Sequence, residues 1–377
     1  MKRYLLKKIV AIILSYYLHF VKMENKHHKF FADTLLQWDN FSNKRAMPWK
    51  GEKDPYKIWI SEIMLQQTRV EQGIGYFNRF MEVFPTIVDL ADSEDDTVFK
   101  LWEGLGYYSR CKNMLTTARF IVSEYKGIFP DTYHSILKLK GIGPYTAAAI
   151  ASFAFNLPYA VVDGNVLRVL SRVFGISEPI DEPSSRKMYD ELANKLLLSQ
   201  NPAQYNQAIM DFGATICKPK APLCNSCPFQ TDCIALKTNL VQKLPIKLKR
   251  LIKKNRFFHY ILFRHQNKIL CRKRTEKDIW QNLFEFYLLE ADKMLSIAEL
   301  LETDSISKLL KGINYKLNRV SIIYKQQLTH QIINGSFYTI DIESILPVDE
   351  SYFAVEEINL RSLPMPKFIF SFLDQNL

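Results

Sequence analysis

Four of the six cysteines crowd into one short segment. They are Cys217, Cys224, Cys227 and Cys233, spaced C-x6-C-x2-C-x5-C, and three prolines in the segment favour a loop over a helix. Four thiolates within 17 residues can ligate one metal centre, which predicts a reducing compartment. An iron–sulfur cluster and a tetrahedral zinc ion both accept four cysteines, and buried cysteines without a metal are the third interpretation. The two remaining cysteines, Cys111 and Cys271, are expected in the core.

Two carboxylates have surroundings that suit proton chemistry. Glu62 lies in IWISEIMLQQTRV (58–70), where helical spacing puts it on an otherwise apolar face, so burial would raise the pKa of a potential proton donor. Asp163 lies in AVVDGNVLRVLSRV (160–173) at the N-cap of a predicted helix, which keeps a carboxylate ionised. Such a pair suits acid-catalysed glycosidic cleavage. A core-edge Glu paired with an Arg and an ordinary helix cap are the alternatives, because 101 residues separate the two.

A glycine hairpin, Gly141-Ile142-Gly143, precedes a predicted helix that begins at Pro144. Glycines there leave backbone N–H groups and a helix N-terminus accessible to a phosphate. This arrangement can hold DNA without reading its sequence. A plain helix–turn–helix contact is the alternative.

Charge and composition narrow the class of protein. Fifty Lys and Arg against 39 Asp and Glu give a net charge of +11, which favours a nucleic-acid partner, although excess charge also serves solubility. An apolar fraction of 47% with only 13 Gly excludes disordered and collagen-like chains. The 377 residues suffice for two or three domains.

The chain reads as two domains joined by a basic segment. Helical spacing from Phe30 to Leu236 predicts a mostly α domain over 23–242, with the cysteine loop at 217–233. Residues 243–256 carry seven basic residues and no acid, which predicts a linker. Short β-branched and aromatic runs then predict an α+β domain over 257–377. Residues 1–22 are interpreted as an extension that the natural protein lacks. The apolar part of the extension is too short to span a bilayer.

The first domain resembles MutY-type adenine DNA glycosylases of the helix–hairpin–helix, or endonuclease III, superfamily. The resemblance rests on ordered motifs and on the cysteine spacing, which matches the iron–sulfur loop of that group. The motifs are PWK (48–50), DPYKIWISEIMLQQTRV (54–70), WEGLGYYSR (102–110), KGIGPYTAAA (140–149), VDGNVLRVLSR (162–172) and NQAIMDFGATIC (206–217). It implies a [4Fe–4S] cluster on the four cysteines and removal of adenine mispaired with 8-oxoguanine or guanine in duplex DNA.

The resemblance also implies roles for individual residues. Glu62 takes the position of the general acid and Asp163 that of the carboxylate that stabilises the sugar cation, with Tyr145 and Asn165 supporting them. Gln67 and Tyr107 match residues that wedge into the base stack. Trp49, Leu65 and Gln207 match the adenine pocket, as does Lys50, where many members carry Arg.

The rival within the superfamily is an endonuclease III-like enzyme for oxidised pyrimidines, which has a nucleophilic Lys where this chain has Tyr145. Some members also have Lys at the position of Leu167. The resemblance therefore implies a monofunctional glycosylase.

The second domain resembles, more thinly, the Nudix-like lesion-reading domain of the same family. The matches are IWQNLFEFY (279–287) and LTHQ (328–331), so Thr329 and His330 are expected to read 8-oxoguanine; a solvated loop is the alternative for His330. Residues 257–377 lack the Glu-rich box of a Nudix hydrolase, which argues against a nucleotide hydrolase. The presence of both Glu62 and Asp163 argues against a silent lesion-binding protein. We expect a cytoplasmic, nucleoid-associated monomer that meets no membrane.

Overall fold

The computed structural model describes residues 27–197, 201–248, 252–344 and 346–376. Chain contacts divide it into two compact units, one of Met1–Met81 with Ser123–Lys249 and one of Glu82–Val122 with Arg250–Leu377. The predicted extension, 1–22, lies outside the described residues. None of the described helices is long and apolar enough to cross a membrane.

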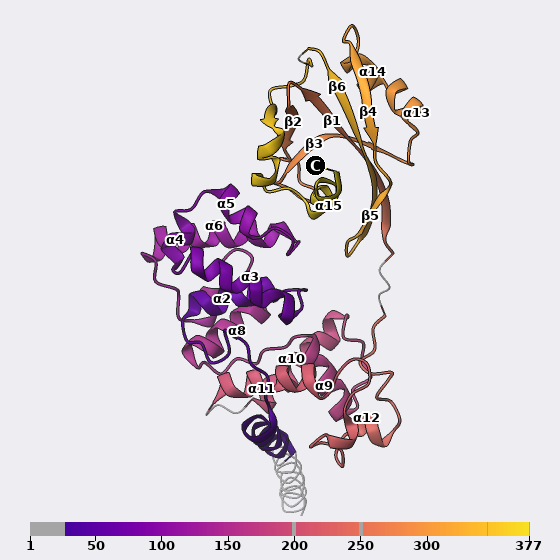
Figure 1. Ribbon diagram of the computed structural model, residues 1–377. Coiled ribbons are helices and arrows are strands. Elements are labelled where there is room, and N and C mark those ends of the chain that lie inside the picture. The colour runs from indigo at the N-terminus through magenta and orange to yellow at the C-terminus, as the bar shows by residue number, and fades with distance from the viewer. Residues whose placement is uncertain (1–26, 198–200, 249–251, 345, 377) are drawn as a thin grey trace, which may run out of the picture. The chain divides into compact units, whose positions relative to one another are not determined.

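The first unit is helical (Figure 1). Residues 27–42 are helical, and α3 and α6 (Tyr108–Tyr125) each extend across a unit boundary. The further elements are α2 (Pro55–Leu65), α3 (Val70–Val83), α7 (Tyr133–Leu137), α8 (Pro144–Phe155), α9 (Gly164–Phe174), α10 (Pro183–Leu196), α11 (Pro202–Thr215), η1 (Cys224–Ser226) and α12 (Ile234–Lys237).

Local sequence sets where these helices begin. Four of them, α2, α8, α10 and α11, start with a proline, whose fixed φ suits the first helical turn and whose missing N–H costs nothing there. The residues that precede α2 and α9, Asp54 and Asp163, cap them with side-chain oxygens. A large apolar core joins α8, α9 and α11, including Val169, Ala208 and Phe212. The mostly helical first half is therefore confirmed.

The second unit combines three helices from the first half of the chain with a mixed sheet. Its helical elements are α4 (Ile87–Ala91), α5 (Asp95–Leu101), α6, α13 (Ile297–Glu302), α14 (Asp304–Leu309), η2 (Glu357–Ser362) and α15 (Lys367–Asn376). Its strands are β1 (Lys254–His265), β2 (Lys268–Lys273), β3 (Phe284–Ala291), β4 (Tyr315–Val320), β5 (Tyr324–Gln327), β6 (Gln331–Ile342) and β7 (Tyr352–Glu356). The sheet order is β4-β6-β1-β3-β2-β7, with β5 also paired to β6.

Helices cover both faces of this sheet. Alternate residues of β1 point to opposite faces, so Ile261 and Phe263 pack with Leu300 and Ile306 of the α13–α14 segment. Tyr260 stacks on Phe337 on the other face, where Phe337 also stacks on Phe372 of α15 with ring centroids 4.2 Å apart. The pairing of β1 with β6 is parallel and the other pairings are antiparallel. The predicted α+β second half is confirmed.

The predicted linker overlaps the first strand of the sheet. β1 begins at Lys254, inside the segment 243–256 that the sequence analysis assigned to a solvated linker. Leu244 is buried, and Arg256 pairs with carboxylates of the sheet. The sequence did not reveal these contacts, because the segment is rich in basic residues and the partners of Arg256 lie more than 20 residues away.

Candidate active site

Glu62 is a buried carboxyl on α2. Its side chain lies among apolar neighbours in the sequence, and only 6% of the residue is exposed. The pKa of Glu62 is raised to about 7, mainly by burial; a hydrogen bond with Tyr145 opposes the rise and the charge of Asp163 adds to it. Neither neighbour is a cation, which sets Glu62 apart from the alternative of a Glu paired with an Arg. A carboxyl with this pKa can give up a proton near neutral pH.

Asp163 caps α9, as the sequence predicted. It accepts hydrogen bonds from the backbone N–H of Val166 at 2.7 Å and from the side-chain amide of Asn165 at 2.6 Å. Burial nevertheless raises the pKa of Asp163 above its usual value, and these hydrogen bonds only oppose the rise. The cap therefore favours the ionised carboxylate against burial, which is the larger influence on the pKa of Asp163, and a persistently ionised Asp163 stays a prediction.

The fold brings together the carboxyl groups that 101 residues separate in the sequence. The charge of Asp163 acts on both Glu62 and Tyr145, and Tyr145 shares a hydrogen bond with Glu62. Tyr145 stands in the first turn of α8, and its hydroxyl also contacts the sulfur of Met210 at 3.8 Å. Asn165 completes the group because it binds Asp163 directly. The four residues thus form one cluster.

A cavity of about 230 Å³ opens beside Glu62. Three of the four residues expected at an adenine pocket line it: Trp49, Lys50 and Gln207. Leu65 is not among the lining residues. The ammonium of Lys50 is engaged, since it donates to Asp211 at 2.9 Å and to the carbonyl of Arg45 at 3.2 Å.

Asp211 on α11 was not identified from the sequence. Its carboxylate is fully buried and accepts hydrogen bonds from Arg45 at 2.8 Å and from Lys50, Gln207 and Asn43, each at 2.9 Å. It therefore holds two side chains of the cavity wall. Its spacing of four residues after Gln207, which puts both on one helix face, was the signal that could have revealed it.

The predicted glycine hairpin is present between α7 and α8. Gly141 has a φ of +80°, which favours glycine, and Gly143 is the N-cap of α8. No side chain among the described residues caps this helix, so its first N–H groups remain available to an anion. Gln67 and Tyr107 are exposed and have positive φ values of 59° and 48°, a strained backbone often found at binding sites.

The four clustered cysteines line one hollow together with Arg172. A guanidinium nitrogen of Arg172 lies 3.5 Å from the sulfur of Cys217, and the sulfur of Cys233 lies 3.3 Å from the carbonyl of Arg172. Burial raises the pKa of Cys227 to about 12, so a metal centre would have to displace the thiol proton. Within the described part of the chain, no three or more His, Cys, Asp or Glu side chains are grouped closely enough to ligate a single metal ion. Four thiols around one hollow are nevertheless a donor set that an iron–sulfur cluster and a tetrahedral zinc ion both accept.

Two buried arginines of α9, also missed in the sequence, hold this loop, and one of them ties it to the carboxylate cluster. Arg168 donates to the side chain of Asn165 at 2.8 Å and to the carbonyl of Cys217 at 2.7 Å. Arg172 donates to the carbonyls of Lys218 at 2.8 Å and of Leu244 at 3.1 Å. Arginines four residues apart on a buried helix face were the available signal. The cysteine loop therefore supports the residue that positions Asp163.

A second cavity, of about 420 Å³, lies within the second unit. Thr329, His330 and Tyr107 all line it, and the hydroxyls of Tyr107 and Thr329 contact each other. Three residues that the sequence analysis assigned to DNA binding therefore share one surface. They belong to the turn 328–331 and to the segment that leads into α6.

Comparison with known proteins points in one direction. Residues 60–196 match the family described as HhH-GPD superfamily base excision DNA repair protein. The adenine DNA glycosylase of Buchnera aphidicola subsp. Acyrthosiphon pisum is 40% identical over 256 residues, which cover 68% of this chain and 73% of that protein. The enzyme of the same name from subsp. Baizongia pistaciae is 36% identical over 308 residues, covering 80% and 83%. The human adenine DNA glycosylase is 41% identical over 215 residues, covering 54% and 39%.

Solved structures agree on the fold of the first half. A thermostable thymine-DNA glycosylase superposes with a TM-score of 0.53 and 30% identity, over 57% of this chain and 99% of that one. Endonuclease III in a non-covalent DNA complex superposes with a TM-score of 0.50 at 20% identity, over 57% and 98%. The second similarity supports the fold alone.

Proposed function

The chain belongs to the adenine DNA glycosylase family, and on that premise we propose that it removes adenine mispaired with 8-oxoguanine, or with guanine, from duplex DNA. It is a DNA glycosylase. The observation that carries the proposal is the buried Glu62, which lies beside Asp163 and beside a cavity lined by Trp49 and Gln207. Burial raises the pKa of Glu62, and neither Tyr145 nor Asp163, which also act on that pKa, is a cation.

Glu62 acts as the general acid. An adenine in the cavity beside α2 receives the proton of Glu62, and the electrons of the N-glycosidic bond leave with the base. Asp163 stabilises the positive charge that develops on the sugar, while Asn165 and Tyr145 orient the two carboxyl groups. Water then adds to the sugar and leaves an abasic site.

The adenine must leave the base stack first. Unpairing and unstacking cost a few kcal/mol, and the cost is smallest at a mismatch, so selectivity begins there. The hairpin at Gly141 and Gly143 grips the phosphate backbone, and Gln67 and Tyr107 fill the space that the adenine leaves. Trp49, Lys50, Leu65 and Gln207 receive the base.

The enzyme is monofunctional. Tyr145 stands where endonuclease III-like relatives have a nucleophilic lysine, and Leu167 is a buried apolar residue on α9. No covalent imine can form at a tyrosine. Borohydride should therefore trap no strong adduct between the enzyme and its DNA.

The second domain, 257–377, reads the base opposite adenine. The hydroxyl of Thr329 and the imidazole of His330 can hydrogen-bond the altered edge of an oxidised purine, and sites built on such bonds lose discrimination when they are removed. Both residues line the cavity of the second unit. The catalytic domain, 23–242, and a linker that ends before β1 begins at Lys254 complete a monomer that acts on the nucleoid in the cytoplasm.

Cys217, Cys224, Cys227 and Cys233 hold a [4Fe–4S] cluster. When bound, the cluster supplies a structural crosslink to a loop that otherwise has little secondary structure. Purified protein should be brown and contain about four iron atoms per chain. Cys224→Ser should lose that colour and destabilise the loop, and colourless, fully active protein with one zinc ion per chain would contradict the assignment.

The function is tested by single-turnover base release from four duplexes: adenine opposite 8-oxoguanine, adenine opposite guanine, thymine opposite guanine, and thymine glycol opposite adenine. Release of adenine from the first two, fastest from the first, is expected. Faster release of thymine or thymine glycol would contradict the proposed substrate, and a trapped borohydride adduct would contradict the monofunctional mechanism.

A further inference from the structure

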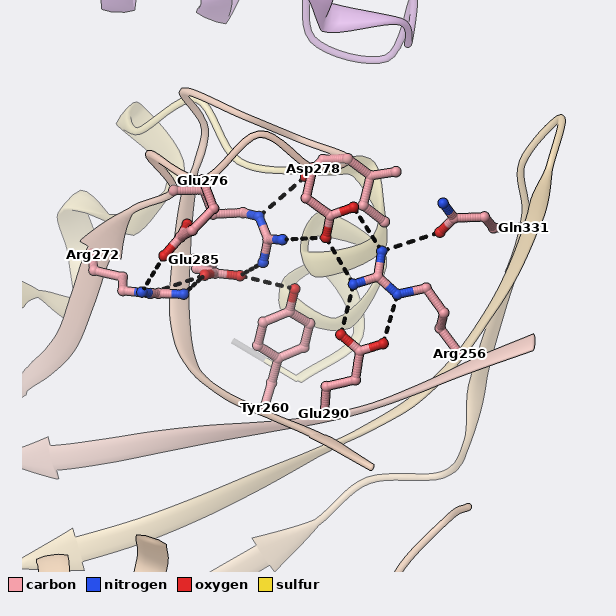
Figure 2. Close-up of polar contacts among 10 residues, drawn as sticks. Arg256, Tyr260, Arg272, Glu276, Asp278, Glu285, Glu290 and Gln331 are labelled. Atoms are coloured by element: carbon pink, nitrogen blue, oxygen red, sulfur yellow. Dashed lines mark hydrogen bonds and ion pairs between the residues drawn. The ribbon is translucent and has the colours of Figure 1, made fainter. Parts of the chain in front are cut away.

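Arg256 on β1 lies between three separate segments of the second half (Figure 2). Its guanidinium donates to both carboxylate oxygens of Glu290 on β3, at 2.7 and 2.6 Å. It also donates to both oxygens of Asp278, at 2.9 and 2.7 Å, and to the side-chain oxygen of Gln331 at 3.1 Å. One side chain thus links β3, the loop 275–282 and the start of β6.

All five N–H donors of the guanidinium are used in these contacts. Only 11% of the Arg256 side chain is exposed, and its hydrogen bonds to Glu290 raise the pKa of Arg256. Lysine has three donors on a single nitrogen and cannot reproduce two bidentate contacts. The positive charge of Arg256 is also paired with the carboxylates of Asp278 and Glu290, so this side chain is unsuited to bind a phosphate.

Two of the three linked segments line the cavity of the second unit. Asp278 belongs to the loop 275–282, and Gln331 directly follows His330 in the turn 328–331; both residues face the cavity. Besides Arg256, the loop is held by Arg274, which donates to the carbonyl of Ile279 and to Asp278, each at 3.1 Å.

Both segments need such support. Trp280 and Asn282 in the loop have φ values of 61° and 70°, a conformation that costs free energy in residues other than glycine. The turn is closed by a hydrogen bond from the N–H of Leu328 to the carbonyl of Gln331 at 2.8 Å. The backbone N–H of Lys254 also donates to the carbonyl of His330 at 3.0 Å, and the side chain of Gln331 adds a tie between the turn and Arg256.

We propose that Arg256 is a positioning residue for lesion reading: by holding Asp278 and Gln331 at once, it fixes the loop 275–282 against the turn that carries Thr329 and His330. The inference rests on the proposed function, because it assigns to this cavity the base opposite adenine. Arg256 touches no substrate. It sets the width of the site in which the hydroxyl and the imidazole must both reach the oxidised edge.

The test compares single-turnover excision of adenine opposite 8-oxoguanine with excision opposite guanine. Arg256→Ala should lower the ratio of the two rates at least about tenfold, the effect of about 1.4 kcal/mol of lost discrimination. Arg256→Lys should lower it nearly as much, because the charge remains and the fork is lost. Gln331→Ala should lower it less, since the backbone of the turn keeps its own hydrogen bond.

Arg264→Ala is the matched control. Arg264 lies on the same strand and makes the same kind of paired contact, with Asp341 at 2.6 and 3.1 Å, but Asp341, unlike Asp278 and Gln331, does not line the cavity. It should leave the ratio unchanged while costing stability. An equal fall in the ratio for Arg264→Ala would mean that general loosening of the sheet is responsible and would overturn the inference.

The controls separate two kinds of failure. If the wild type itself shows no preference for 8-oxoguanine, the proposed lesion reading fails and the inference falls with it. If the wild type shows the preference and Arg256→Ala keeps it, only the inference fails. Should Arg256→Ala not fold, Asp278→Ala removes one of the two bidentate contacts, and an unchanged ratio in that variant overturns the inference equally.

Discussion

Glu62 and Glu285 are both buried carboxyl groups, yet their neighbours differ. Glu285 on β3 is fully buried and accepts hydrogen bonds from Arg274 at 2.5 Å, Arg272 at 3.0 Å and Tyr260 at 3.3 Å. Glu62 has Tyr145 and a second carboxylate near it, and burial dominates its pKa.

The two sets of neighbours suit the two carboxyl groups to different roles. Burial raises the pKa of Glu285 as well, but the two arginines oppose the rise, so its carboxylate is held by partners and joins parts of the sheet. A carboxyl without such a partner keeps a proton that it can transfer. The same residue type therefore joins parts of the sheet in the second half of the chain and, in the proposed mechanism, donates a proton in the first.

The largest effect is expected from Glu62→Gln. The amide cannot protonate the adenine, so single-turnover excision should fall about 10²–10⁴-fold while DNA binding persists. A gel assay of base release and a binding titration on the same duplex measure both. Glu71→Gln, at an exposed carboxylate in α3, is the control and should cut normally. Near-native excision by Glu62→Gln would remove the distinction between the two glutamates.

Glu285→Gln should instead cost stability. It leaves the Arg274 guanidinium, which is 3% exposed, without its closest carboxylate, and breaking a buried pair in this way costs about 3–5 kcal/mol. Chemical denaturation measures the change in the free energy of unfolding. Glu276→Gln removes a half-exposed partner of Arg272 and should cost no more than about 1 kcal/mol. Equal costs for the two variants would mean that burial of the pair does not matter.

A smaller effect concerns the pH dependence of stability. The pKa of Glu62 is raised from 4.5 to about 7, so the folded state binds a proton more tightly than the unfolded state, and wild-type stability falls as pH rises through that window. The shift corresponds to about 3 kcal/mol. Glu62→Gln does not titrate. Its free energy of unfolding should therefore rise relative to that of the wild type between pH 4.5 and about 7, and the difference should stay constant at higher pH. A difference independent of pH would contradict the shift.

The sequence was most informative where a residue's surroundings are local. The caps and prolines predicted where α8 and α9 begin, and the short β-branched and aromatic runs predicted strands in the second half. The burial of Glu62 followed from its place on an apolar helix face.

Contacts between distant segments were beyond such reasoning. Asp211 meets Arg45 across 166 residues, and Arg256 meets Gln331 across 75. Neither pairing leaves a local pattern, so the sequence did not show that Asp211 holds Lys50, and it assigned Arg256 to a solvated linker. The burial that raises the pKa of Asp163 depends on helices that the sequence does not place.

The central claim is that Glu62 is the proton donor and that burial is the main cause of its raised pKa. Its most direct test is the single-turnover rate of adenine excision opposite 8-oxoguanine from about pH 5 to about pH 9, for the wild type and Glu62→Gln. The wild-type rate should be level at low pH, break near neutrality and then fall about tenfold per pH unit, because only the protonated carboxyl acts. The Glu62→Gln rate should be low and free of that break. A wild-type rate that stays constant through neutrality, or the same break in both proteins, would contradict the account.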